Sequence, residues 1–256
     1  MVTVRAVRRL ALAAALTLAL GLLSGCMYRA EIERQAANPA FIQEEIDRVA
    51  GAVKRYYEAR GVYPIANADA STPTYEKYVI DLNRLVQAGM LSGLPRNAFE
   101  AGGNYYYLLI RPETEPEPVV KLMDIAAVQA VAELQREVDS YRRDNGGVLP
   151  AGPETAPGFF AVDYDALKRK APDIVSPLTN RTLPVLLHES GETLIDYGLD
   201  IVEASRRAGE GASLAEGADA REWLVLASPL APVRSYPYAW RGGEPQLVTP
   251  SAELPK

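Results

Sequence analysis

The sequence has almost no cysteine or histidine: Cys26 and His188 are the only ones among 256 residues. A single cysteine excludes an intramolecular disulfide and a cluster of cysteine metal ligands. A lone histidine with no nucleophile at a readable spacing predicts a structural or exposed residue rather than a metal ligand or a base. Nucleophile-elbow, P-loop, dinucleotide and zinc motifs are also missing. We therefore expect a protein that is not an enzyme and that holds no metal or cofactor.

The apolar run near the N-terminus is too short to span a bilayer. Residues 11–20 (ALAAALTLAL), even when extended to Leu23, fall short of the ~20 residues that a transmembrane helix needs. Arginines at positions 5, 8 and 9 precede this run. A positive cluster followed by a short apolar region is typical of a secretory signal. Residues 1–25 are therefore predicted to be a signal peptide.

The four residues Leu23-Ser24-Gly25-Cys26 resemble the lipobox of bacterial lipoproteins. This resemblance implies that cleavage leaves Cys26 as the first residue and that its sulfur carries a covalent diacylglycerol. Two acyl chains anchor a protein firmly, since each buried CH₂ contributes ~0.8 kcal/mol. An ordinary signal peptide with an incidental cysteine is the alternative. We expect a chain that is lipid-anchored at the extracytoplasmic face of the cell membrane, with residues 26–40 as a polar tether.

Basic residues are too few to balance the acidic ones. Lys and Arg number 27 against 33 Asp and Glu, which gives a net charge of −6. Removal of residues 1–25 would make the chain more acidic still. An acidic protein repels phosphate backbones, so no nucleic-acid partner is expected. It gains no attraction from anionic lipids either, so the lipid anchor must hold it at the membrane.

Beyond the tether, the sequence reads as an internal repeat. Apolar residues at steps of three and four predict one helix around residues 42–56 and another around residues 131–141. Both helices run into related segments, GVYP (61–64) and GVLP (147–150). A short second helix is expected after Asp81 and after Asp163, because a carboxylate favours a helix start.

Each copy is expected to close with a β-hairpin. The predicted strands are 105–110 with 119–123 in the first copy, and 183–188 with 193–197 in the second. Asp124 and Asp200 stand where a following helix would need an N-cap. These elements place repeat 1 at 41–124 and repeat 2 at 125–198, in an α+β fold of two tandem helix–loop–hairpin units. Whether each long helix packs on its own hairpin or on the other one stays open.

The last portion, 199–256, differs from the repeats. It is predicted to hold a helix stub at 200–208, a Gly/Ala-rich flexible loop at 208–220, and strands at 222–229, 233–240 and 241–248. Gly242-Gly243 is the expected last turn. These strands would extend the edge of the sheet.

The order of helix, GxYP segment, loop, short helix and hairpin resembles the globular domains of type II secretion pseudopilins and type IV pilins. The residues that carry this likeness are Tyr56, Tyr57, Gly61, Tyr63 and Pro64, with Tyr141, Gly146, Gly147 and Pro150 in the second copy. The resemblance implies a pilin-like globular architecture. Pilins keep their apolar helix, whereas cleavage at Cys26 would remove it here, so pilin-type assembly is not expected.

Nearly the full mature length also resembles a family of uncharacterised Firmicute lipoproteins, which are often labelled as binding lipoproteins of ABC transporters. The likeness includes the lipobox, YEKYVIDLNRLV (75–86), NAFEAGG (97–103), an SPL turn and the Tyr-Pro-Tyr near the end. It implies a cellular location but transfers no catalytic or binding residue.

Tyrosine is unusually frequent among the aromatic residues, with 14 tyrosines against four phenylalanines. Its apolar face and polar tip suit sugar or peptide binding, although core packing is the alternative in alternating strands. The candidate binding patch is Tyr63, Tyr75, Tyr78, Tyr105 and Tyr107. The acidic, proline-rich loop RPETEPEP (111–118) is predicted to be extended and solvated, with docking of a partner as the alternative.

Together these observations predict a non-catalytic binding or scaffold protein of the bacterial envelope. Its expected partner is another envelope protein or a wall polymer. Two alternatives stay open: a solute-binding lipoprotein of an ABC transporter, and an envelope hydrolase with an unrecognised site.

Overall fold

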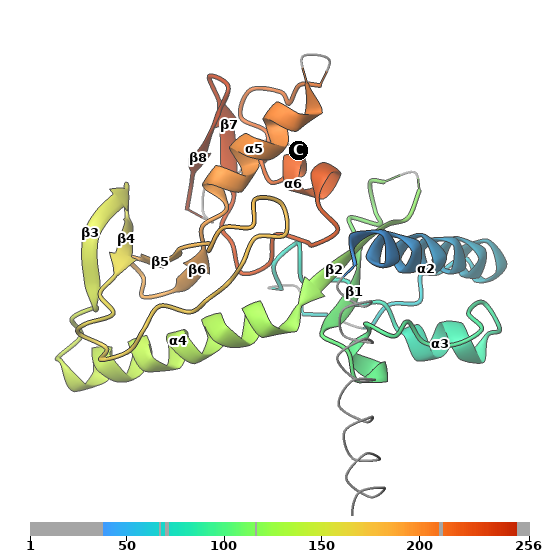
Figure 1. Ribbon diagram of the computed structural model, residues 1–256, viewed down its shortest axis with the longest axis horizontal. Helices are drawn as coiled ribbons and strands as arrows, with labels where there is room; N and C mark the ends of the chain where they lie inside the picture. The colour runs from blue at the N-terminus through green and yellow to red at the C-terminus, as the bar shows by residue number, and fades with distance from the viewer. Residues whose placement is uncertain (1–37, 67, 70–71, 116, 210–211, 250–256) are drawn as a thin grey trace, which may run out of the picture. The chain divides into compact units, whose positions relative to one another are not determined.

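The computed structural model describes residues 38–249, except 67, 70, 71, 116, 210 and 211 (Figure 1). The predicted signal peptide, Cys26 and most of the tether lie outside the described residues. The chain divides into two compact units, Met1–Glu45 and Ile46–Lys256. Among the described helices, none is both long and apolar enough to cross a membrane.

The first predicted helix is confirmed as α2 (Pro39–Arg60). Its apolar stripe is buried, with Val49 and Val53 fully inaccessible. Arg55 attaches the helix to the loop after α3 (Leu82–Gln87), since its guanidinium donates to the carbonyl of Met90 at 2.9 Å. The helix ends at Arg60, and Gly61 follows with a φ of +70°, a conformation that glycine adopts without a steric penalty.

The first predicted hairpin is also confirmed, as β1 (Tyr105–Ile110) and β2 (Val119–Asp124). Its strands are antiparallel, with Ile110 opposite Val119 next to the loop. Val79 forms a bridge to Leu108 on the other side of β1. The segment at residues 78–80 therefore lies beside β1 and brings its neighbours to the loop end of the hairpin.

Helix α4 (Ile125–Asp144) opens the second half, and Asp124 caps it as predicted by accepting from the N–H groups of Ala126 and Ala127. A four-stranded antiparallel sheet follows, in the order β3 (Ala151–Ala156), β4 (Phe159–Val162), β5 (Val185–His188) and β6 (Thr193–Ile195). The pair β5–β6 is the second predicted hairpin. Neither β3 nor β4 was predicted. The segment AGPETA of β3 is polar and contains proline, as edge strands often do.

The second helix packs on the sheet of its own half. Val131, Leu134 and Val138 of α4 form one buried cluster with side chains of β4, β5 and β6 (Figure 1). Every residue of β5 and β6 is buried, so these short strands are covered on both faces. The question that the sequence left open is thus answered for α4.

Equivalent backbone hydrogen bonds form within each of the two halves. The N–H of Asp81 donates to the carbonyl of Pro64 at 2.7 Å, and that of Asp163 donates to Pro150 at 2.9 Å. Each aspartate side chain accepts from the N–H three residues further on, at 2.9 Å in both cases. In both halves, the residue after this proline pairs in antiparallel fashion with the residue before this aspartate. The order of pairings is therefore the same in each half.

Two aspartates do not act as predicted. After Asp81 the short helix α3 forms, but after Asp163 the chain makes only a turn, in which Lys168 takes a φ of +54°. A left-handed residue at that point cannot continue a helix. Asp200 is not an N-cap, because α5 (Gly198–Ala208) begins two residues earlier. Its buried carboxylate instead accepts from the hydroxyl groups of Ser176 and Thr179.

The C-terminal portion corrects a further prediction. Residues 222–229 were expected to form a strand, but Glu222–Ala227 is helix α6. A short continuous apolar run fits a buried strand and a buried helix equally well, so periodicity could not separate them. The last hairpin is confirmed as β7 (Tyr238–Arg241) and β8 (Glu244–Leu247), with both glycines of its turn at positive φ.

That hairpin is a separate two-stranded sheet rather than an extension of the larger one. The chain between α6 and β7 provides the edge instead. The N–H of Leu122 in β2 donates to Pro229 at 2.9 Å, and the N–H of Ile195 in β6 donates to Arg234 at 2.7 Å. One connecting segment thus pairs with the last strand of each half.

Candidate functional site

An open pocket lies beside the loop of the first hairpin and has a volume of about 650 Å³. This volume lies within the ~300–1,000 Å³ that small-molecule sites occupy. Two segments form the pocket, the turn 74–78 before the bridge to β1 and the loop 111–115 after β1. All seven lining residues are polar or charged: Thr74, Lys77, Tyr78, Arg111, Glu113, Thr114 and Glu115.

The loop that lines the pocket is a tight turn where the sequence predicted an extended segment. The carbonyl of Arg111 accepts from the N–H groups of Thr114 and Glu115, at 3.0 and 3.1 Å. Arg111 itself has a φ of +41°, a left-handed conformation that is uncommon for residues other than glycine. Contacts of its side chain with a distant helix explain how this conformation is held.

The Arg111 guanidinium joins the loop to α6. It donates both Nη groups to the two carboxylate oxygens of Glu222, with Nη2 at 2.6 Å from Oε2, and Nη2 also lies 2.7 Å from Glu115. The hydroxyl group of buried Tyr75 donates to Glu222 at 2.6 Å. Burial opposes the charge on Arg111, but the carboxylate of Glu222 outweighs it and raises the pKa of the guanidinium. The loop is therefore fixed before any ligand arrives.

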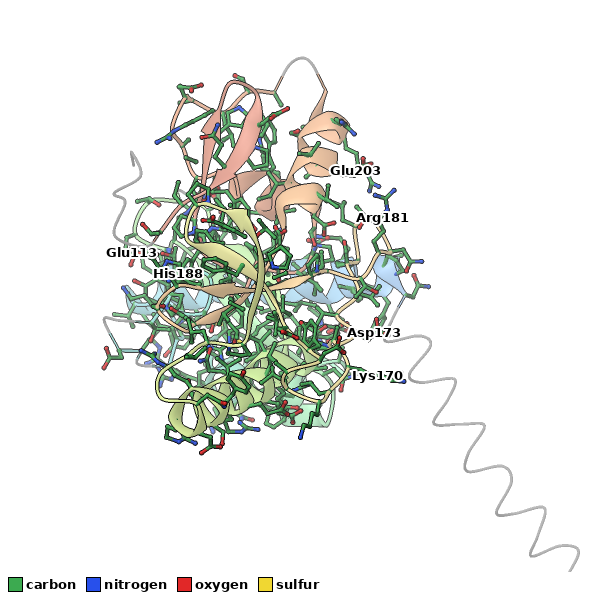
Figure 2. All side chains as sticks on the ribbon, turned by 90° about the vertical axis from the view of Figure 1, so that its left-hand side faces the viewer. Glu113, Lys170, Asp173, Arg181, His188 and Glu203 are labelled. Atoms are coloured by element: carbon green, nitrogen blue, oxygen red, sulfur yellow. The ribbon has the colours of Figure 1, made fainter. Side chains whose placement is uncertain are left out.

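The opposite wall is built around Tyr78. Its hydroxyl group donates to Glu113, and the ammonium group of Lys77 lies 5.0 Å from the centre of its ring. This arrangement is a cation–π contact. Glu113 is exposed and stands at the edge of the ribbon in Figure 2. The pocket thus presents two cations and two carboxylates on its walls, and every one of the four has an oppositely charged or aromatic neighbour.

The five tyrosines of the candidate patch are not gathered on one surface. Tyr75 and Tyr107 are only 2% and 1% exposed, so the prediction is wrong for both. Tyr75 packs in a buried cluster with Val225 of α6. Tyr107 lies in the part of β1 where every residue is buried, and its hydroxyl group donates to Asn97 at 2.7 Å. Tyr63 stacks on Tyr57 with ring centres 4.3 Å apart. Tyr105 is half-buried.

Tyr78 is the one member of that patch that lines the pocket. Sequence reasoning singled out Tyr78 and the 111–118 loop separately, and no motif joins them, because the bridge between Val79 and Leu108 creates the contact. It did not single out Thr74 or Lys77. The polar cluster YEKY beside a hydrophobic run was the only available signal for them.

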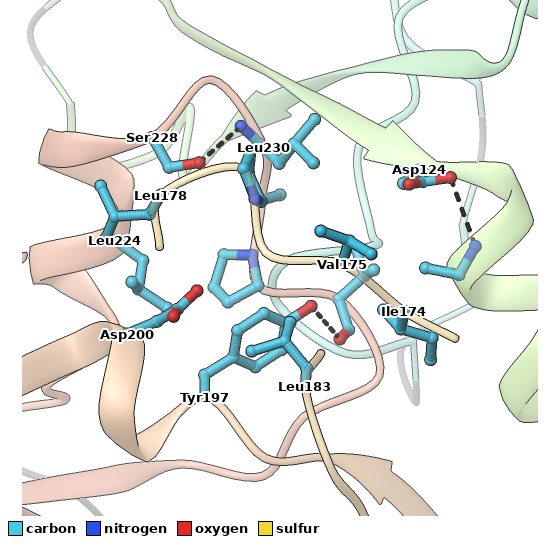
Figure 3. Close-up of a pocket in the computed structure, with 15 residues that line it drawn as sticks. Asp124, Ile174, Val175, Leu178, Leu183, Tyr197, Asp200, Leu224, Ser228 and Leu230 are labelled. Carbon is cyan, nitrogen blue, oxygen red and sulfur yellow. Dashed lines mark hydrogen bonds between the residues drawn. The ribbon is translucent and has the colours of Figure 1, made fainter. Parts of the chain in front are cut away.

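A second, mostly apolar pocket lies between the loop 174–183, the starts of α4 and α5, and the segment 228–233 (Figure 3). The space that a water-sized molecule can enter is about 30 Å³, room for one or two waters. Polar groups that line it already have hydrogen-bond partners within the protein, since Tyr197 donates to the carbonyl of Val233 and Ser228 accepts from the N–H of Leu230. We interpret it as a narrow gap left where these segments pack together.

His188 lies at the end of β5, 8% exposed, with its ring against those of Phe159 and Tyr236. Its Nδ1 is 2.8 Å from the hydroxyl oxygen of Ser190, two residues further along the same turn. Such a contact shapes the turn, and the residue sits in packing as the sequence predicted. Across the part of the chain that is described, no three His, Cys, Asp or Glu side chains are grouped to hold a metal ion.

Searches of curated proteins and of solved structures found no match. A family model does match part of the chain: residues 42–124 are similar to the YphF family N-terminal domain. The matched range contains all seven residues that line the open pocket, whereas Glu222, which fixes its loop, lies outside that range.

Proposed function

We propose that the protein is a lipid-anchored lipoprotein of the extracytoplasmic face of the cell membrane and acts as a non-catalytic binding protein of the bacterial envelope. The anchor is the diacylglycerol that the lipobox implies on Cys26. The partner is an envelope protein or a wall polymer, and the acidic composition disfavours nucleic acid.

The observation that carries the binding role is the open polar pocket of residues 74–78 and 111–115. Its walls are fixed in advance by the ion pair of Arg111 with Glu222 and by the hydrogen bond of Tyr78 to Glu113. A binding surface that is already ordered loses less conformational entropy when a ligand arrives. A recognition site binds more tightly when its polar side chains already hold the positions in which they contact a ligand.

A photo-crosslinking amino acid at position 114 tests this role in intact cells. Thr114 is exposed and lines the pocket, so we expect an adduct with an envelope component. The matched control is the same amino acid at Val148, which is exposed at 60% and lies outside the pocket. Equal adducts from both positions, or none from position 114, would contradict the proposed role.

A solute-binding lipoprotein of an ABC transporter is the second candidate, and the pocket volume of about 650 Å³ favours it. Ligand binding to the folded state raises its apparent stability by mass action. A small solute that raises the melting temperature of the wild-type protein, but not of Tyr78→Ala, would favour this candidate over the scaffold.

We further propose that residues 41–124 and 125–198 are copies of one module. The matched hydrogen bonds of Asp81 with Pro64 and of Asp163 with Pro150 support the duplication. The exposure along the two GVxP segments supports it as well, because in both the valine is exposed and the proline buried. The pilin-like character of the module stays a prediction.

A further inference from the structure

The side chains of the open pocket define the chemical class of ligand it takes, an inference that rests on the proposed binding function. Two cations and two carboxylates line the pocket. Lys77 lies over the ring of Tyr78, whose hydroxyl group donates to Glu113, and Arg111 is paired with Glu115. Three hydroxyl groups stand among them, on Thr74, Tyr78 and Thr114. Those of Tyr78 and Thr114 already donate, to Glu113 and to the carbonyl of Arg111, and can still accept a hydrogen bond. The lining residues therefore offer hydrogen-bond donors and acceptors close together, with two positive and two negative charges, and Glu222 behind Arg111 adds a third carboxylate.

This mixture of charges works against ligands of three other classes. A polyanion would approach Lys77 and Arg111 only by also approaching Glu113 and Glu115, which repel it. A polycation would be attracted by Glu113 and Glu115 but repelled by Lys77 and Arg111. An apolar ligand would remove water from four charged groups without replacing the lost hydrogen bonds.

Hydroxyl groups both donate and accept, so a polyhydroxylated ligand can satisfy carboxylates and cations at the same time. The ring of Tyr78 adds an apolar surface of the kind on which a sugar ring can pack. Arg111 is held by Glu222 and Glu115, and its turn is closed by hydrogen bonds of its carbonyl. Little conformational entropy of Arg111 is therefore lost when a ligand binds.

We propose that this pocket binds a neutral, hydroxyl-rich glycan, and that the glycan strand of the cell wall is the polymer that the protein contacts. The pocket is open to solvent beside the loop of the first hairpin, so a sugar unit can enter it from outside. The N-acetylglucosamine tetramer is a soluble probe of this chemistry, and insoluble wall freed of protein and anionic polymers is the polymeric probe.

The test measures binding of the full-length protein in detergent to both probes. The pocket variants are Glu113→Gln and Tyr78→Ala, and the matched controls are Glu58→Gln and Tyr57→Ala, which change exposed residues of α2. We expect each pocket variant to bind about tenfold more weakly, the effect of one lost charged or aromatic contact, and both controls to bind as the wild type does. Glu113 is exposed, so its variant keeps the fold, and circular dichroism of each variant checks this.

Wild-type binding is expected to change little between about 50 and 500 mM salt, because a neutral ligand releases no counterions. Binding that disappears when anionic polymers are removed from the wall, or that salt weakens tenfold, would overturn the proposal in favour of a polyanion. Unchanged binding in both pocket variants, or no binding by the wild type, would overturn it as well. If the tetramer and the wall fail to bind while position 114 still crosslinks to an envelope component, the glycan is wrong and the binding function survives.

Discussion

The guanidinium of Arg111, in the loop after β1, forms a two-pronged ion pair with the carboxylate of Glu222 in α6, 111 residues further along the chain. The pair is partly buried, with side-chain exposures of 30% and 17%. It ties the pocket loop to the C-terminal portion of the protein. Removal of one partner leaves the other in a poorly solvated position, which is the costly way to break such a pair.

We expect Glu222→Gln to lower the free energy of unfolding by about 1–3 kcal/mol, below the full value for a buried pair because both side chains keep some contact with water. Urea denaturation measures the change. The surface pair of Lys54 with Glu117, whose side chains are 48% and 65% exposed, is the control. Lys54→Ala should leave the stability essentially unchanged, because solvent screens this exposed pair. Equal effects at both sites would contradict the structural role of the Arg111 pair.

Gly103 is the glycine whose side-chain position has no room. A Cβ there would lie 2.2 Å from the backbone carbonyl of Asn97, whereas at Gly93 it would meet nothing within 4 Å. We expect Gly103→Ala to cost about 3 kcal/mol or more, since the backbone must move, and Gly93→Ala to be neutral or slightly stabilising. Thermal unfolding of the two variants gives the comparison, and a Gly103→Ala protein as stable as the wild type would be inconsistent with this backbone contact.

The two matched aspartates should contribute similarly to stability. Asp81 and Asp163 each accept a backbone N–H three residues on, so substitution by alanine removes one side-chain-to-backbone hydrogen bond in each half. We expect each variant to lose about 1 kcal/mol, and the two losses to add in the double variant because the sites are independent. Chemical denaturation of the four proteins tests this. A loss at one site alone would count against equivalent roles in a duplicated module.

Buried tyrosines predict a loss of stability in alkali. Burial raises the pKa of Tyr75, Tyr197 and Tyr238, with nearby carboxylates adding to the effect. A group whose pKa is higher in the folded state contributes stability below its unfolded value of 10.0, and that contribution falls as the pH rises above it. Unfolding free energies between pH 8 and about pH 11 should therefore be constant at first and then decline. A constant stability up to about pH 11 would contradict the burial of these hydroxyl groups.

The sequence predicted the parts of the fold that depend on local patterns. The stripes of α2 and α4, the hairpin β1–β2 and the cap at Asp124 all follow from spacing and composition. It failed where tertiary contacts decide. Strand β3 is polar because it is an edge, and α6 carries an apolar run that also suits a strand.

The candidate site shows the same division. Tyr78 was singled out by its residue type, but the burial of Tyr75 and Tyr107 depends on what packs over them, which a count of tyrosines does not contain. The turn at Arg111 could not be predicted, because its left-handed backbone is held by Glu222 from a distant helix. The sequence pointed to Tyr78 and to the loop that line the pocket, but not to the turn and the ion pair that hold the loop in place.

Mass spectrometry of the N-terminal peptide, taken from protein purified out of the membrane fraction of its native cells, decides whether the chain is lipid-anchored at Cys26. A chain that begins at Cys26 and carries the mass of a diacylglycerol on that residue is the predicted result. A mature chain that begins elsewhere, or a Cys26 with a free thiol, would contradict the account of an anchored binding lipoprotein.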